Sequence, residues 1–263
     1  MQIPSSTPKP YRLGVCLSGG GARGFAHIGA MHALREYGLI PDIIAGVSAG
    51  SVVAAFYASG LLNDINNDPL LTLFSNAQFR NFAEMHIPRE SFFSLERFRK
   101  ILEKELPYKN IEDLPIKTLI CATEIDQGTK VAFTNGPLAE SIVASCSIPI
   151  VFEPVTINGH RYVDGGVLRN LPAWALRHQC DYLIGINCSP LYSPEEPASN
   201  IWEIAQRSYS LMSRNNINAD LEMCDLVISL TETANHQVFS LKDIQNIKLS
   251  GYRTAVTALK KLR

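Results

Sequence analysis

Residues 42–58 read D-I-I-A-G-V-S-A-G-S-V-V-A-A-F-Y-A and contain the pentapeptide G-x-S-x-G at residues 46–50. The apolar, β-branched residues before the pentapeptide predict a short buried strand, and the run after it is compatible with a helix. A serine at such a strand-to-helix turn exposes its hydroxyl at the edge of the sheet, and flanking glycines let neighbouring backbone pass close by. We therefore predict that Ser48 is a nucleophile; a turn of small residues without chemistry is the alternative.

A glycine-rich stretch lies upstream, where residues 11–17 predict a buried strand and residues 18–24 read S-G-G-G-A-R-G. A helix is expected from about residue 22 to residue 37. Such a turn presents backbone N–H groups to an anion, which in acyl transfer is the tetrahedral oxyanion. The stretch also matches the dinucleotide fingerprint G-x-G-x-x-G, but the second strand ends in the serine turn and not in an acidic residue that would hold a ribose.

A third motif, V-D-G-G, occupies residues 163–166. It follows two short β-prone runs joined by Asn158-Gly159, which is a strong signal for a tight β-hairpin. We therefore expect Asp164 at a strand exit, on a turn whose glycines let its carboxylate approach other backbone. An ordinary Asp-Gly turn is the alternative.

Together these motifs resemble those of the patatin-like phospholipase family. The resemblance rests on the loop at 19–24, the elbow at 46–50 and the aspartate motif at 164–166, in the family's order. Residues 144–155, A-S-C-S-I-P-I-V-F-E-P-V, look like the stretch that the family carries before its aspartate, although Ile150 stands where many members have glycine. The resemblance covers about residues 13–172.

Alternating strands and helices predict one layered α/β domain, and the resemblance implies a three-layer α/β/α sandwich with a mainly parallel central sheet. It also implies a Ser-Asp dyad, with Ser48 as nucleophile and Asp164 as general base. A serine hydroxyl needs such a base, and burial would make the carboxylate a better one. The resemblance further implies an oxyanion hole at Gly20 and Gly21, with Arg23 orienting the loop or meeting a lipid phosphate. The motif glycines are Gly19, Gly24, Gly46, Gly50, Gly165 and Gly166.

The implied activity is hydrolysis of fatty-acyl esters of lipids, of the phospholipase A type, through an acyl-enzyme intermediate. Three alternatives stay open. An α/β-hydrolase triad needs a late histidine, for which His236 is the best candidate and His178 the other. A silent lipid- or nucleotide-binding regulator needs no activated serine, and acyl transfer uses an acceptor other than water.

The composition narrows the class of protein. The chain has 263 residues, 46% of them hydrophobic, and a net charge of −1, so nothing indicates nucleic-acid binding. No C-x-x-C pair occurs, which favours reduced thiols and a cytoplasmic location. Residues 1–10 lack an apolar targeting segment, and the uncharged residues 43–62 are explained by the strand and helix around the elbow. We predict no metal or cofactor and leave the oligomeric state open. The cysteines are Cys16, Cys121, Cys146, Cys180, Cys188 and Cys224.

We expect a single domain over residues 1–263, with a lid or cap inserted at about 61–114. This segment alternates apolar and basic residues, and a helix over 94–106 has an apolar face. A lid over an acyl pocket would make peripheral contact with a membrane; an insertion packed on the core is the alternative. Its aromatic residues are Phe74, Phe79, Phe82, Phe92, Phe93, Phe98 and Tyr108.

Overall fold

A computed structural model describes residues 8–65, 68–75, 95–189, 200–235, 241 and 243–261. The strands are β1 Tyr11–Leu17, β2 Ile43–Val47, β3 Lys117–Glu124, β4 Thr129–Phe133, β5 Val155–Ile157, β6 His160–Asp164, β7 Cys180–Asn187 and β8 Leu226–Ser229. The α-helices are α1 Phe25–Glu36, α2 Ala49–Ala58, α3 Pro69–Ser75, α5 Leu95–Glu105, α6 Leu138–Ser145, α7 Ala173–Leu176, α8 Ile201–Asn215, α9 Asn218–Leu221 and α10 Ile244–Lys260. Short 3₁₀ turns are η1 Gly21–Gly24, η2 Ile111–Asp113, η3 Gly165–Val167 and η4 Thr231–Asn235.

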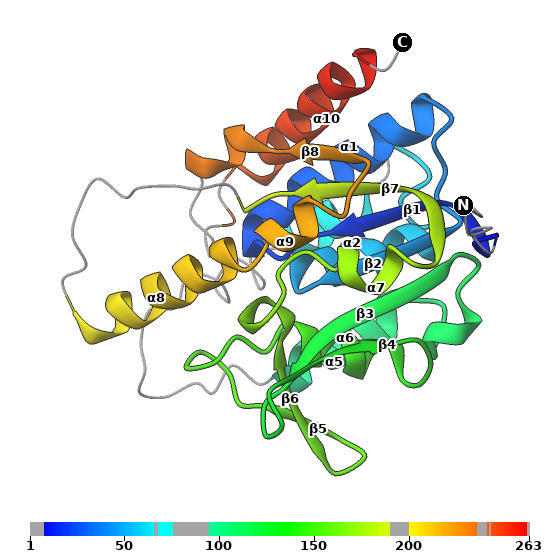
Figure 1. Ribbon diagram of the computed structural model, residues 1–263. Coiled ribbons are helices and arrows are strands. Elements are labelled where there is room, and N and C mark those ends of the chain that lie inside the picture. Colours follow the sequence, from blue (N-terminus) through cyan, green and yellow to red (C-terminus); the bar gives the residue numbers. More distant parts are fainter. Residues whose placement is uncertain are drawn as a thin grey trace, which may run out of the picture.

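One mixed sheet forms the centre of the fold (Figure 1), with the strand order β5-β6-β3-β2-β1-β7-β8 and with β4 paired to β3. Strands β3, β2, β1, β7 and β8 run parallel to one another, and β4, β5 and β6 pair antiparallel. The predicted α/β architecture with a mainly parallel central sheet is therefore confirmed. The carboxyl ends of β1, β2 and β7 meet at one edge, where open α/β sheets place their sites.

Helices cover both faces of the sheet, so its central strands are buried on both sides. On β1, Leu13, Val15 and Leu17 point to the face that packs against α1, α2 and α10. Cys16 points to the opposite face and packs in a cluster that includes Leu176 of α7. All six cysteines are free thiols, and four of them are fully buried.

Helices α1 and α10 cross at backbone contact. A Cβ added to Gly29 would lie 2.0 Å from the carbonyl oxygen of Lys248, and one added to Gly251 would lie 2.0 Å from that of Ala26. Only glycine permits this approach at both positions, so the two helices form one tight layer.

Local signals predicted most elements well. The Asn158-Gly159 turn joins β5 to β6 with φ angles of 51° and 82°, as a two-residue hairpin turn of this type requires. The expected helix from residue 22 begins instead with the 3₁₀ turn η1, and the α-helix starts at Phe25. The uncharged residues 43–62 form β2, α2 and the turn after them. Among the described residues no helix is long and apolar enough to cross a membrane.

The described parts of the 61–114 segment pack against the core. Leu70 and Leu71 of α3 and Phe98 and Leu102 of α5 are buried in the cluster that also holds α1 and α2. Residues 76–94, which include Phe79, Phe82, Phe92 and Phe93, lie outside the described residues. The lid hypothesis for that part stays a prediction.

Candidate active site

Ser48 occupies a strained turn between β2 and α2. Its φ and ψ angles are 52° and −124°, a combination that costs a residue with a side chain about 1–3 kcal/mol. The turn is closed by hydrogen bonds from the N–H and the hydroxyl of Ser51 to the Ser48 carbonyl, at 2.8 and 2.6 Å. This is the sharp strand-to-helix turn that the pentapeptide predicts.

The glycines on either side of Ser48 are required by contact. A Cβ on Gly46 would lie 2.3 Å from the carbonyl oxygen of Gly50, and a Cβ on Gly50 would lie 2.4 Å from that of Leu17. Real Cβ atoms do not approach backbone so closely, so the elbow packs on itself and on the end of β1.

A second serine, Ser145, stabilises the elbow through a hydrogen bond to its backbone. The backbone N–H of Ser48 donates a hydrogen bond of 2.8 Å to the hydroxyl of Ser145, which itself donates one of 2.6 Å to the carbonyl of Cys121 on β3. Ser145 is fully buried at the end of α6. It therefore ties the strained turn to the neighbouring strand.

The glycine-rich loop lies directly against the elbow. A Cβ on Gly24 would lie 2.5 Å from the Cβ of Ala49, and a Cβ on Gly19 would lie 3.2 Å from that of Ser48. The loop is anchored by hydrogen bonds from Gly19 N–H to the carbonyl of Asn170, at 3.1 Å, and from the Ser189 hydroxyl to the carbonyl of Gly19, at 2.6 Å.

Two backbone donors of this loop remain available at the pocket. The N–H groups of Gly20 and Gly21 have no hydrogen-bond acceptor among the described residues, and both glycines line the same pocket as Ser48. The N–H of Arg23 donates to the carbonyl of Gly20 at 3.3 Å, so only its side chain can serve a ligand. The geometry thus favours Gly20 and Gly21 as oxyanion donors over the backbone of Arg23.

His27 supports the start of the same loop. Its Nε2 lies 2.8 Å from the carbonyl oxygen of Ser18 in a fully buried position. Burial lowers the pKa of His27 to about 4, and the contact with Ser18 partly opposes this shift. His27 is therefore neutral at pH 7 and has a structural role.

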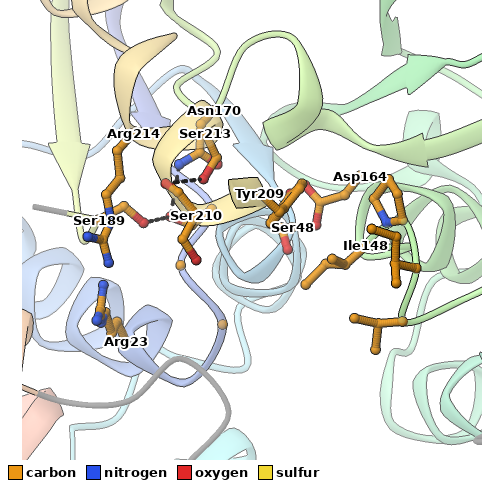
Figure 2. A pocket seen from close by; sticks show the side chains of 16 residues that line it. Arg23, Ser48, Ile148, Asp164, Asn170, Ser189, Tyr209, Ser210, Ser213 and Arg214 are labelled. Atoms are coloured by element: carbon orange, nitrogen blue, oxygen red, sulfur yellow. Dashed lines mark hydrogen bonds between the residues drawn. The ribbon is translucent and has the colours of Figure 1, made fainter. Parts of the chain in front are cut away.

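Asp164 ends β6 and points into the pocket (Figure 2). Its Oδ1 accepts a hydrogen bond of 2.7 Å from the N–H of Gly166, whereas Oδ2 has no partner among the described residues. Burial raises the pKa of Asp164 to about 6; the nearby Ser48 hydroxyl, the Gly166 N–H and the Tyr209 hydroxyl act in the opposite direction. A carboxylate with this pKa is ionised at neutral pH and is a better base than one in water.

Tyr209 of α8 lies beside Ser48 and Asp164 in the pocket (Figure 2). A Cβ on Gly166 would lie 2.6 Å from the Tyr209 hydroxyl and 3.0 Å from Oδ1 of Asp164. Burial and the adjacent carboxylate raise the pKa of Tyr209 well above its usual value. Its hydroxyl therefore stays protonated and can donate to the carboxylate.

Helix α8 is docked onto the aspartate turn by asparagines. The side chain of Asn216 donates to the carbonyl of Gly166 at 2.8 Å and accepts from the N–H of Asn170 at 2.9 Å. Asn170 in turn accepts from the glycine-rich loop through its carbonyl. One chain of hydrogen bonds thus connects α8, the aspartate turn and the glycine-rich loop.

The other end of the pocket is basic. Arg23 of η1 and Arg214 of α8 are both buried and both line the pocket. Figure 2 shows their guanidinium groups pointing toward each other near Ser189, away from Ser48 and Asp164. Two converging guanidinium groups are suited to binding a phosphate or carboxylate.

Neither histidine of the alternative triad meets Asp164 in the described structure. His178 is exposed and does not line the pocket, and His236 lies outside the described residues. No group of three or more metal-ligating side chains occurs in the part of the chain that the structure describes.

Comparison with known proteins identifies the family of the chain. A sequence profile of the family described as patatin-like phospholipase matches residues 15–177, which include all three motifs. The match covers more than half of the chain. The chain therefore belongs to the patatin-like phospholipase family.

Several relatives are similar in sequence. An uncharacterized NTE family protein of Mycobacterium bovis, Mb1092c, is 37% identical over 171 residues, covering 64% of this chain and 45% of the relative. Lysophospholipase NTE1 of Candida albicans is 27% identical over 228 residues, covering 83% and 16%. The neuropathy target esterase sws of Drosophila melanogaster is 31% identical over 172 residues, covering 61% and 12%. This chain spans less than half the length of each of these relatives.

Among solved structures, VipD from Legionella pneumophila aligns with a TM-score of 0.55. The alignment covers 97% of this chain and 68% of that chain at 16% identity. At this identity the likeness concerns the fold alone.

Proposed function

We propose that this chain is a serine acyl hydrolase that cleaves fatty-acyl esters of lipids, with Ser48 as the nucleophile and Asp164 as the base. The observation that carries the proposal is the convergence of three parts on one pocket. These parts are a serine on a strained elbow, a buried carboxylate with a raised pKa, and two glycine N–H groups without acceptors among the described residues. The names of the esterase and lysophospholipase relatives support the same class of reaction.

In the proposed first half-reaction, the carboxylate of Asp164 takes the proton of Ser48 as Oγ attacks the ester carbonyl carbon. The N–H groups of Gly20 and Gly21 stabilise the resulting oxyanion, and one such donor contributes roughly a hundredfold to a thousandfold in rate. The bond to the alcohol oxygen then breaks, and Asp164 returns the proton to the leaving alcohol. An acyl-enzyme on Ser48 remains.

In the second half-reaction, water attacks the acyl-enzyme and gives a proton to Asp164. The tetrahedral intermediate collapses, Ser48 recovers its proton, and the fatty acid leaves. An alcohol or lysolipid in place of water would give acyl transfer by the same steps, so product analysis with an added acceptor separates the two outcomes.

The basic end of the pocket favours a substrate that carries a phosphate. Arg23 and Arg214 lie at the opposite end from the dyad, so a phosphate there leaves an ester near Ser48. We therefore propose phospholipids or lysophospholipids as substrates in preference to neutral glycerides. A lid or cap at about residues 61–114, inserted in a single domain, remains part of the proposal.

Covalent labelling tests the proposal against the silent binding module. A fluorophosphonate probe reacts only with an activated serine, so intact mass should rise by one adduct that peptide mapping places on Ser48. The Ser48→Ala protein should remain unlabelled, and Ser59→Ala, a serine at the C-terminal end of α2, should still label. Absence of labelling in the folded native protein would support a binding module instead.

A further inference from the structure

Helix α8 exposes four large apolar side chains along one side, where Ser208 and Asn215 are also exposed, and turns polar side chains to the pocket. Ile201, Ile204, Leu211 and Met212 are 80%, 49%, 50% and 51% exposed. At 3.6 residues per turn these four positions fall within an arc of about 100°. We call them the outer face of α8.

The inner side of the same helix is polar and belongs to the pocket. Tyr209, Ser210, Ser213 and Arg214 all line it, and they occupy the side of the helix opposite the outer face. A surface helix ordinarily buries its apolar side and exposes its polar side. The orientation of α8 is the reverse, so its outer face calls for a partner of its own.

Resting on the proposed function, we propose that the outer face of α8 docks on a lipid surface and thereby holds the pocket against the substrate. The outer face and the pocket-lining side belong to the same helix, so a membrane docked on this face lies within one helix diameter, about 10 Å, of the candidate active site. The charged residues Glu203, Arg207 and Arg214 lie outside the apolar arc, as in helices that rest in a membrane interface.

Another exposed apolar side chain, that of Ile150, lies at the pocket itself. Ile150 lines the pocket and is 67% exposed. Its φ angle of 75° is one that glycine tolerates and a β-branched residue does not, so the chain keeps an isoleucine there despite strain. An exposed apolar side chain at the rim of the pocket is unfavourable in water. Contact with lipid would remove it from water.

The docking surface can be tested with the full chain. Vesicles of phosphatidylcholine, with and without phosphatidylglycerol, are sedimented with the Ser48→Ala protein, which leaves the lipid intact. Adding Ile204→Glu and Leu211→Glu should lower the fraction bound at least about tenfold, because charge replaces apolar contact. The matched control is Leu249→Glu on α10, where the native leucine is 43% exposed; binding should stay within about twofold.

Hydrolysis separates this inference from the proposed function. With Ser48 present, the α8 double variant should cleave a soluble p-nitrophenyl ester at the native rate and vesicle lipid at least about tenfold more slowly. Failure of the native protein on both substrates would contradict the proposed function, while the vesicle-binding arm would still decide the docking surface.

Two results would overturn the docking proposal. One is unchanged vesicle binding by the double variant. The other is a native dimer that the double variant converts to a monomer, by light scattering, without loss of vesicle binding, which would assign the outer face to a second copy. Ile204→Ser with Leu211→Ser repeats the comparison if the charged variant melts early.

Discussion

The hydroxyl of Ser145 accepts a hydrogen bond of 2.8 Å from the backbone N–H of Ser48. The same hydroxyl donates a hydrogen bond of 2.6 Å to the carbonyl of Cys121. The strained φ and ψ angles of the elbow are therefore held by a side chain from a helix about one hundred residues further along the chain. Ser145 should matter to the reaction although it does not line the pocket.

Replacing Ser145 with alanine leaves the N–H of Ser48 and the carbonyl of Cys121 without that partner. We expect a loss of about 1–3 kcal/mol in the free energy of unfolding and a fall in kcat of roughly tenfold to a hundredfold as the nucleophile shifts. Urea titration and ester hydrolysis measure the two effects. Ser141→Ala on the same helix removes only a bond to the carbonyl of Pro137 and should be nearly neutral.

Tyr209 should tune the pH dependence of the reaction. The native kcat/KM is expected to fall below pH about 6, where Asp164 becomes protonated. The Tyr209 hydroxyl stabilises the charged carboxylate, so Tyr209→Phe should raise the pKa of Asp164. The acidic limb of the profile of kcat/KM against pH should then move to higher pH by about one unit. Ser48 and the Gly166 N–H still face Asp164 in this variant, as does Cys146, whose thiol pKa the carboxylate helps to raise.

The matched control for this variant is Tyr57→Phe. Tyr57 is also buried, and its hydroxyl has no partner among the described residues. It does not line the pocket, so the acidic limb should stay in place. An unmoved limb in Tyr209→Phe would show that the hydroxyl does not act on Asp164.

The ionised carboxylate of Asp164, which the proposed reaction requires, should lower the stability of the folded protein at neutral pH. Its pKa in the folded protein is raised from 3.8 to about 6, so the folded state holds the proton more tightly than the unfolded chain does. The stability that this proton brings is present below pH 4 and is lost as the pH rises through 6. Asp164→Asn should therefore be more stable than the native protein above pH 6, on the order of 1–3 kcal/mol, and nearly equal to it at pH 4.

Chemical denaturation at several pH values measures this difference. A gain in stability of Asp164→Asn that is constant from pH 4 to pH 8 would contradict the raised pKa. A loss of stability at pH 8 would show that the carboxylate has stabilising contacts that the described structure lacks.

Arg214 should select for phosphate. Arg214→Gln removes one of the two guanidinium groups at the basic end of the pocket, so KM for a short-chain lysophospholipid should rise about tenfold. KM for a neutral p-nitrophenyl ester should change little, and kcat should hold for both. Arg253→Gln, an exposed arginine of α10, is the control. Equal changes on both substrates would contradict a phosphate site.

The three motifs were predictable because each is local. The spacing of apolar residues and the placement of glycines predict a strand, a turn and a helix around residues 46–50. The same local signals predict the loop at 19–24 and the hairpin before Asp164. The parallel pairing of β1 with β2 then brings the first two turns to one edge, and the antiparallel pairing of β6 with β3 places Asp164 beside Ala122. Chain order and motif type therefore predicted most of the candidate site.

The remaining parts of the site come from long-range packing. Tyr209, Asn216 and Arg214 all lie on or just after α8, in a helix whose sequence carries no motif. Their roles depend on which side of α8 faces the protein, and the helical period would have predicted the apolar side. Ser145 falls within the stretch that the family resemblance singles out, but its hydrogen bond to Ser48 requires the fold.

The most direct test of the account is fatty-acid release by the native protein, Ser48→Ala and Asp164→Asn, on a soluble p-nitrophenyl ester and on phospholipid vesicles at pH 8. The account predicts hydrolysis by the native protein and its loss in both folded variants. Activity that survives Asp164→Asn but not Ser48→Ala would contradict the dyad and move the base elsewhere, with His236→Ala as the next variant.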